Sequence, residues 1–332
     1  GTLEDLDTSD ATATPKDILK GKTAYVNGVK ITGTYIQSTL GSVTGNENTN
    51  TEVNDSLGNK VTVPAGFKVV NPSDTVLDGI IIEDVSAGDS VSKGNQFVWI
   101  PVGKINTPDG IEEIKLARYD FYMKGEDGNY PEMGTDEYKE ETASEHAASG
   151  YKNAIAKDIN QFINNTNQKG GYYLGRFEAG NQDDRVVSKK GVPVYNMIPQ
   201  YDASDNAQNM YDKTDYTSDL VNSYAWDTAI IFIEKFGENK NYATQNGSNT
   251  QGSLVSTGES ILSDTGKEDV QCNIYDMAGN LHELETETCC IEGLGSYTNR
   301  GGRYNSEEYA SNRSGGNMAG GYNWGFRVII YL

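Results

Sequence analysis

Cysteine is scarce in this chain of 332 residues, and its pattern excludes a disulfide-stabilised fold. The three cysteines are Cys272, Cys289 and Cys290. An odd number, with two residues adjacent in sequence, does not form a disulfide framework, so we expect reduced thiols that are partly buried. The stability of the fold must therefore come from a hydrophobic core.

Basic residues are also few, since 27 lysines and arginines stand against 48 aspartates and glutamates. The net charge of -21 makes nucleic acid and anionic membrane surfaces unfavourable partners, because phosphate binding needs a basic patch. No apolar run approaches the roughly 18 residues of a membrane-spanning helix, and no signal peptide is visible. Such acidity favours a soluble, exposed protein, either secreted or carried on a virion.

The first sixty residues predict a small module and a linker. Thr14 and Pro15 are typical of the N-cap and first residue of a short helix, and Asn27-Gly28 predicts a hairpin turn. Residues 13–28 resemble a recurring module of bacteriophage tail proteins. The module 1–40 has too few apolar residues to be stable alone. We expect it to pack against copies of itself, for example as a homotrimer, or against other phage tail components. Residues 41–60 are polar and predict a linker.

Residues 61–332 are expected to form one large α+β domain. Amphipathic stripes predict helices near 151–166 and 222–236. Short apolar segments bounded by glycine and proline predict strands. These segments are 61–63, 67–70, 79–82, 96–102 and 172–178. The polar stretches 180–220 and 238–268 are expected to be irregular loops.

The C-terminal segment combines a predicted strand with a region of restricted composition. Phe326, Val328 and Ile330 alternate with other residues, which indicates a strand buried on at least one face. Residues 295–324 contain 7 Gly, 5 Asn, 4 Ser and 4 Tyr. Antibody loops use these residues because tyrosine gives contact area at low entropy cost, while the others adapt their hydrogen bonds. A binding surface and an ordinary glycine-rich surface loop both fit this composition.

Five separated segments occur in the order found in one known family. They are Gln96–Pro101, Tyr173–Glu178, Ser223–Ala229, Asp276–Leu284, and Arg300–Gly302 with Arg313 and Gly325–Arg327. Together they resemble the C-type lectin fold of the formylglycine-generating-enzyme type, over residues 61–332. In that family's Asp-Met-x-Gly-Asn-Val-Trp-Glu-Trp motif, His282 and Leu284 here replace the two tryptophans.

The resemblance implies binding rather than catalysis. Enzymes of this family use two cysteines shortly after the Gly-Gly pair, but no cysteine follows Gly302, and Ser306 stands near the first position. A hydroxyl does not replace a thiolate in that chemistry. His282 is expected to pack rather than to catalyse. An oxidase homologue and a purely structural phage tail protein remain as alternatives.

Non-enzymatic members of the family include the variable proteins of diversity-generating retroelements, many of which are phage tail receptor-binding proteins. Their variable repeat ends at Gly-Phe-Arg, which implies a variable region at 293–327 here. The expected partner is a host cell-surface protein or glycan. The residues expected to be exposed and to bind it are Tyr297, Asn299, Tyr304, Asn305, Ser306, Glu307, Glu308, Tyr309, Asn317, Met318, Tyr322 and Asn323. The residues expected to be scaffold are Gly301, Gly302, Arg313, Gly325, Phe326 and Arg327.

No cofactor is expected, although calcium is a candidate ligand for Glu283, which keeps the family's acidic position. A carboxylate buried against Arg303 or Arg327 fits that position equally well. The sugar-reading calcium motifs of animal lectins are absent, so calcium-dependent sugar binding has no support. The resemblance places the protein on a phage or prophage virion tail, or on a bacterial extracellular surface.

Overall fold

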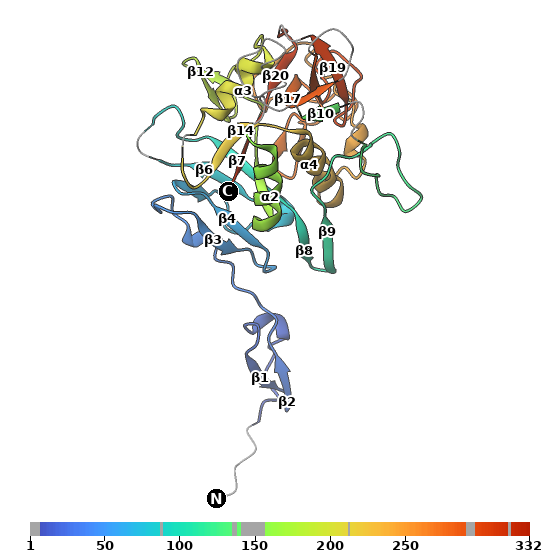
Figure 1. The fold of residues 1–332 in the computed structure, drawn as a ribbon. Helices are drawn as coiled ribbons and strands as arrows, with labels where there is room; N and C mark the ends of the chain where they lie inside the picture. The colour runs from blue at the N-terminus through green and yellow to red at the C-terminus, as the bar shows by residue number, and fades with distance from the viewer. Residues whose placement is uncertain are drawn as a thin grey trace, which may run out of the picture.

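The computed structural model describes residues 7–86, 89–134, 138–140, 157–211, 213–289, 296–317 and 320–332. Within these ranges the protein is mostly β-structure with three α-helices, in agreement with the expected α+β class. Figure 1 shows a large body and a small N-terminal hairpin that projects away from it. No helix in the described ranges is long and apolar enough to cross a membrane.

A six-stranded antiparallel sheet forms the centre of the body. Its strands in spatial order are β14 (Thr217–Leu220), β21 (Val328–Tyr331), β11 (Gly171–Gly175), β7 (Gln96–Pro101), β6 (Ile81–Asp84) and β5 (Phe67–Val69). The last strand of the chain, β21, lies between β11 and β14, and all four of its residues are buried. The C-terminal end is therefore fixed inside the sheet.

Three α-helices occur among the described residues, namely α2 (Ile159–Lys169), α3 (Gln200–Gln208) and α4 (Ser223–Phe236). Helix α4 confirms the helix expected at 222–236, with Asn222 accepting a hydrogen bond from the backbone N–H of Ala225 as its cap. Helix α2 begins at residue 159, after the capping residue Asp158, and not near 151; residues 151–156 lie outside the described ranges. Helix α3 lies in a stretch that was expected to be irregular.

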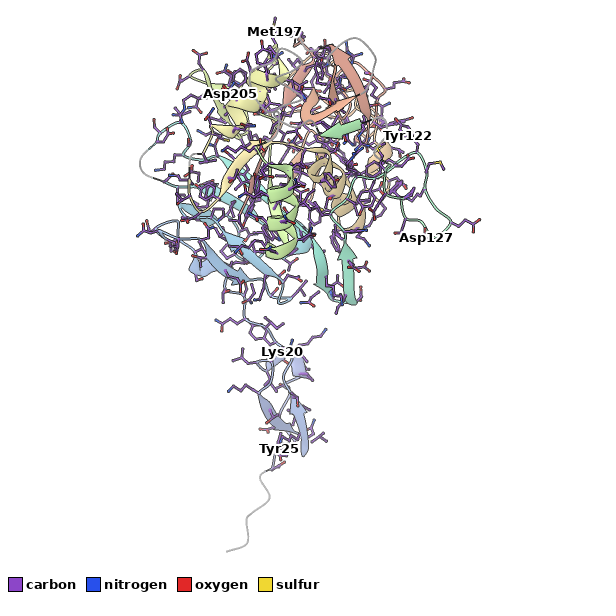
Figure 2. The ribbon with its side chains drawn as sticks, viewed as in Figure 1. Lys20, Tyr25, Tyr122, Asp127, Met197 and Asp205 are labelled. Carbon is purple, nitrogen blue, oxygen red and sulfur yellow. The ribbon has the colours of Figure 1, made fainter. Side chains whose placement is uncertain are left out.

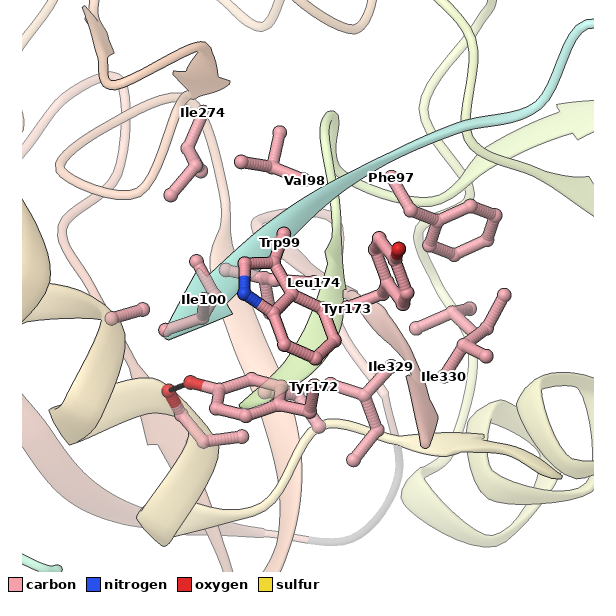
Figure 3. Packing of buried hydrophobic residues seen from close by; sticks show 14 of the residues in the cluster. Phe97, Val98, Trp99, Ile100, Tyr172, Tyr173, Leu174, Ile274, Ile329 and Ile330 are labelled. Carbon is pink, nitrogen blue, oxygen red and sulfur yellow. Dashed lines mark hydrogen bonds between the residues drawn. The ribbon is translucent and has the colours of Figure 1, made fainter. Parts of the chain in front are cut away.

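Aromatic residues of the central sheet connect it to its surroundings, as Figure 3 shows. The rings of Trp99 and Tyr173 pack with their centroids 5.0 Å apart. The buried hydroxyl of Tyr172 donates to the carbonyl oxygen of Ala225 in α4. The hydroxyl of Tyr173 donates to the carbonyl oxygen of Thr62 at 3.0 Å. The sheet, α4 and the segment around residue 62 are thus joined by satisfied polar groups inside an apolar core.

A second sheet contains most of the C-terminal segment and lies at the end of the body opposite the hairpin (Figure 1). Its strands are β10 (Tyr138–Glu140), β17 (His282–Cys289), β18 (Ser296–Arg300) and β19 (Arg313–Asn317), with β20 (Trp324–Phe326) parallel to β17. Only Arg327 separates β20 from β21. The final residues of the chain therefore connect the second sheet directly to the centre of the first.

Short elements complete the described structure. The two-stranded ribbons are β1 (Thr23–Val26) with β2 (Val29–Thr32), β3 (Thr51–Asn54) with β4 (Lys60–Val63), β8 (Gly103–Thr107) with β9 (Gly110–Ile114), β12 (Gly180–Gln182) with β13 (Arg185–Val187), and β15 (Val270–Gln271) with β16 (Ile274–Tyr275). Single 3-10 turns occur at η1 (Pro15–Asp17), η2 (Leu40–Ser42), η3 (Val76–Asp78) and η4 (Tyr242–Thr244). The hairpin expected around Asn27-Gly28 is present as β1 and β2.

The expectation of a polar linker at 41–60 is wrong for this segment. Strand β3 pairs with β4, and Val43 and Val53 are buried in the core. Asp55 is also fully buried, and its carboxylate accepts from the backbone N–H groups of Asn59 at 2.8 Å and Val76 at 2.8 Å. Two of the few apolar residues of the segment are thus in the core, which average composition cannot show. The body therefore begins near Leu40.

Candidate ligand-binding face

The loop that joins β18 to β19, residues 301–312, is held by backbone hydrogen bonds to two neighbouring segments. The N–H of Gly247 donates to the carbonyl oxygen of Glu308 at 2.7 Å, and the N–H of Asn249 donates to that of Tyr304 at 3.0 Å. The N–H of Tyr304 donates in turn to the carbonyl oxygen of Asn280 at 3.0 Å. Since every residue except proline carries these groups, the bonds do not depend on the side chains of the loop.

Glycines allow this loop to approach its neighbours closely. A β-carbon at Gly302 would lie 2.3 Å from the carbonyl oxygen of Ala278 and 2.6 Å from that of Glu308. A β-carbon at Gly247 would lie 2.6 Å from the α-carbon of Gly302. No side chain fits at these distances, so glycine at both positions is required by backbone packing.

His282 lies between the loop and the turn that precedes β20. Its Nδ1 is 2.8 Å from the carbonyl oxygen of Gly301, and its Nε2 is 2.9 Å from a carboxylate oxygen of Glu308. Its backbone N–H donates to the carbonyl oxygen of Asn323 at 2.9 Å. The hydrogen bond from His282 is the largest cause that lowers the pKa of Glu308 to about 2. Each ring nitrogen of His282 thus has an oxygen atom of the loop within hydrogen-bond distance, one from the backbone and one from a side chain.

A segment outside the C-terminal region supports the turn at 320–323. The side-chain amide of Asn196 donates to the carbonyl oxygen of Tyr322 at 2.6 Å, and the backbone N–H of Met197 donates to that of Gly321 at 3.1 Å. Met197 itself has a left-handed backbone with φ of 56° and an exposed side chain, which Figure 2 shows at the outer surface. We define the candidate face as residues 303–309 and 320–323, joined through His282.

Most of the predicted binding residues in these two stretches reach solvent. The exposed ones are Asn305, Glu307, Tyr309 and Tyr322, and the half-buried ones are Tyr304, Ser306, Glu308 and Asn323. The side chain of Asn317 and all of Met318 lie outside what the structure describes. The predicted scaffold residues Gly301, Gly302, Arg313, Gly325, Phe326 and Arg327 are all buried, as expected.

Two predicted binding residues, Tyr297 and Asn299, are buried and not exposed. Both belong to β18, which is paired with β17 on one side and β19 on the other and is covered on both faces. The ring of Tyr297 packs against that of Trp324 with centroids 5.2 Å apart. The side-chain oxygen of Asn299 accepts from the hydroxyl of Ser314 at 2.7 Å. The expectation of exposure is therefore wrong for these two residues. They belong to a strand inside the sheet, where neighbouring elements cover the side chains, and not to a surface loop.

Buried ion pairs lie beneath the loop and hold β17, β18 and β19 to α4. Asp227 accepts from Arg300 and, at 2.7 Å, from Arg313. Glu287 contacts Arg313 at 3.1 Å and Arg118 at 3.0 Å, while Arg300 lies 3.5 Å from Glu285. Burial raises the pKa of Glu285 to about 8, and Arg300 opposes this shift. Three arginines and three acidic side chains thus contact one another away from water, so each buried arginine has an acidic partner.

The carboxylate of Glu283, the predicted calcium ligand, is hydrogen-bonded to Arg327. This carboxylate is fully buried and accepts from Nε of Arg327 at 2.9 Å and from Nη2 at 2.5 Å. Arg327 also donates to the carbonyl oxygens of Gly175 at 2.8 Å and Tyr275 at 2.8 Å. Glu283 therefore has the alternative role, a buried partner of Arg327. Among the described residues, no three His, Cys, Asp or Glu side chains are grouped to hold a metal ion.

The cysteines do not supply an obvious nucleophile in the part of the chain that the structure describes. Cys272 is a half-buried thiol, and burial raises its pKa to about 12. A thiol of this kind is not a thiolate near neutral pH, so it is a poor nucleophile. The side chain of Cys289 and all of Cys290 lie outside the described residues.

Sequence reasoning missed two features beside the candidate face. Asn196 and Met197, which contact the turn at 320–323, lie in a polar stretch with no signal that connects them to the C-terminal region. A cavity of about 360 Å³ lies next to the end of the loop, lined by the segment Tyr119–Met123 with Met133, Ser311 and Arg313. Figure 2 shows Tyr122 of this segment at the surface of the body.

No protein-family model and no curated protein matches this chain. Two solved structures show a distant likeness to it. CarF has a TM-score of 0.35 and 13% identity, covering 49% of this chain and 87% of its own. Variable protein 1 of Treponema denticola has a TM-score of 0.31 and 14% identity, covering 74% of this chain and 98% of its own. Both scores are too low to carry an argument about function.

Proposed function

We propose that this protein is a non-enzymatic ligand-binding protein with a C-type lectin fold of the formylglycine-generating-enzyme type. The candidate face is its variable binding site. The observation that carries this proposal is the separation of roles in the loop 301–312. Neighbouring segments bind its backbone, whereas Asn305, Glu307 and Tyr309 point their side chains to solvent. Exposed substitutions usually change stability by no more than about 0.5 kcal/mol, so this loop can vary without loss of the fold.

The tyrosines of the face are the residues that contribute most to binding in this proposal. Tyr304, Tyr309 and Tyr322 combine a large contact area with few rotatable bonds, and tyrosine is enriched among residues that dominate binding energy. The ligand is a host cell-surface protein or glycan, and the protein acts in host attachment as part of a phage tail. The resemblance of residues 13–28 to a phage tail module supports this placement.

A randomised library tests the proposal without knowledge of the ligand. The full chain is displayed with the codons for Tyr304, Asn305, Glu307, Tyr309 and Tyr322 randomised, and the folded fraction is measured by protease resistance. We expect most members to remain folded, and selection against a panel of unrelated cell-surface proteins and glycans to yield binders.

The matched control is a second library with Tyr297 and Asn299 randomised. These residues belong to the same segment but are buried, so most members should lose protease resistance. Equal loss of folding in both libraries would show that the exposed residues are structural. A folded first library that yields no binder against any target would leave only a structural tail protein or an enzyme as the function.

A further inference from the structure

The N-terminal hairpin segment, residues 7–36, has regular structure but no core. Strands β1 and β2 pair along their full length, and the N–H of Gly33 donates to the carbonyl oxygen of Lys22 at 2.7 Å. The N–H of Tyr35 donates to that of Ile18 at 2.9 Å. Within the segment only Gly33 is buried. Ordering a backbone costs about 1–2 kcal/mol per residue, and an isolated two-stranded hairpin is marginal in water. A surface outside the segment must therefore complete it.

One face of this hairpin is entirely apolar. In the register of β1 and β2, Ala24 lies opposite Ile31, and Val26 lies opposite Val29. Opposite residues share a face of the ribbon and successive pairs alternate, so these four side chains lie together. The other face carries Thr23, Thr32, Tyr25 and Lys30. We name the four apolar residues the apolar hairpin face; its outermost member, Val29, is 62% exposed.

The body of the protein does not cover this face, in which Val29 is exposed and Ala24, Val26 and Ile31 are half-buried. Figure 1 shows the hairpin projecting from the body, and Figure 2 shows Lys20 and Tyr25 on this projection, clear of the body. Four of the large hydrophobic side chains that are exposed in the described structure belong to this short segment, namely Leu19, Tyr25, Val29 and Tyr35. So many exposed apolar residues on a small element indicate that the segment interacts with a partner, and Val29 is the one that lies on the apolar hairpin face.

Charge favours a second copy of this chain as the occupant. Residues 7–36 contain four lysines and three aspartates, whereas the whole chain has 27 basic and 48 acidic residues. All of the excess negative charge therefore lies outside the hairpin segment, so two bodies repel each other far more strongly than two hairpins do. The apolar hairpin face carries no charge and no polar side-chain group. An identical face can cover it without burying an unpaired polar atom.

We propose that the apolar hairpin face packs against the same face of at least one further copy of this chain. This inference does not rest on the function proposed above, although it adds to it. The hairpin lies at the end of the protein opposite β19 and β20, as Figure 1 shows. Copies joined at their hairpins present several candidate faces away from the point of attachment. Weak individual contacts then combine into a higher overall affinity.

Light scattering and sedimentation equilibrium of the full-length chain test the proposal. The expected mass is at least twice the 36.2 kDa of one chain, and the double variant Val26→Glu/Val29→Glu should return it to one chain. Ile111→Glu on β9 is the matched control, because Ile111 is 66% exposed on the body and should leave the mass unchanged. A single-chain mass for the parent at high concentration would overturn the proposal and indicate a different protein as the partner.

A second variant guards against the case in which the glutamates only unfold the hairpin. Val29→Cys should form a disulfide-linked pair of chains under mild oxidation, because the two faces meet at this residue. Ile111→Cys and the parent, which keeps its native cysteines, give the background level of linkage. Equal linkage in all three proteins would show that the hairpins do not meet through this face.

Discussion

Strand β18 and the loop 301–312 follow one another in sequence but relate to the rest of the protein in opposite ways. In β18 the neighbours contact side chains: Tyr297 packs on Trp324, and Arg300 pairs with Asp227. In the loop the neighbours contact mainly the backbone, apart from the pair of His282 with Glu308, and Glu307 and other side chains reach solvent. Both stretches are rich in tyrosine, asparagine and serine. Composition alone therefore does not separate a residue that stabilises the fold from one that can bind a ligand.

The largest effect is expected where β18 and β19 are joined to α4. Asp227→Ala would leave Arg300 and Arg313 buried without a shared carboxylate, and breaking a buried pair in this way costs about 3–5 kcal/mol. Chemical denaturation of the full chain measures the loss. Glu307→Ala, on the exposed part of the loop, is the control and should change stability by no more than about 0.5 kcal/mol. Similar small losses in both variants would contradict the assignment of the ion pairs as support for β18.

Tyr297 in β18 and Tyr309 in the loop allow the strand and the loop to be compared with the same residue type. Tyr297→Ala removes a fully buried ring and should cost about 3–5 kcal/mol, as expected for large aromatic residues in a core. Tyr309→Ala removes an exposed ring and should leave the melting temperature nearly unchanged. Thermal unfolding followed by near-ultraviolet circular dichroism measures both. If Tyr309→Ala proves the more damaging, the loop is part of the core and its proposed role is wrong.

The elements that the sequence predicted well are those with strong apolar patterns. Helix α4 has a continuous apolar stripe that includes Ala229 and Ile233, together with a clear cap at Asn222. Strands β4, β5, β6 and β7 lie within two residues of their expected positions. In each case the local pattern and the tertiary burial favour the same structure, so the prediction does not depend on contacts distant in sequence.

The failures arise where burial depends on partners that are distant in sequence. Helix α3 buries only small or polar residues such as Ala203 and Ala207, so no apolar stripe reveals it. The segment 41–60 has few apolar residues, but β4 and the core enclose Val53. Tyr297 becomes buried because β17 and β19 pair on either side of β18. In the candidate site, the exposed position of the loop was predictable, but the contact of the loop with His282 and that of the turn 320–323 with Asn196 were not.

A smaller effect is expected from disturbing the backbone contacts that hold the loop. Gly302→Ala places a β-carbon within 2.6 Å of two carbonyl oxygens, so the loop must shift, at a cost of about 1–3 kcal/mol. Gly134→Ala is the control, because a β-carbon there meets no atom within 4 Å. Denaturation measures stability, and limited proteolysis between residues 303 and 309 measures the position of the loop. Equal behaviour of the two variants would mean that close glycine packing does not fix the loop.

The smallest expected effect is on the pH dependence of stability. Glu285 under β18 and Glu308 in the loop have pKa shifts of opposite direction, so they change stability in opposite senses as the pH rises. Burial raises the pKa of Glu285 to about 8, so the folded state binds its proton more tightly. The stability that this proton provides is lost as the pH rises from the ordinary value of 4.5 towards 8. The pKa of Glu308 is lowered to about 2, mainly by the hydrogen bond from His282. Its contribution is present above pH 4.5 and is lost as the pH falls from 4.5 towards 2.

Glu308→Gln should therefore flatten the stability curve between pH 2 and 4.5. The effect is small because the Glu308 side chain is 35% exposed and solvent weakens its interactions. Urea unfolding at half-unit pH steps measures the curve, with the exposed neighbour Glu307→Gln as the control that should keep the parent's acid slope. A parent-like acid slope in Glu308→Gln would show that His282 does not hold the loop through this carboxylate. The backbone contacts and glycine packing would then be the means by which the loop stays in place while its side chains vary.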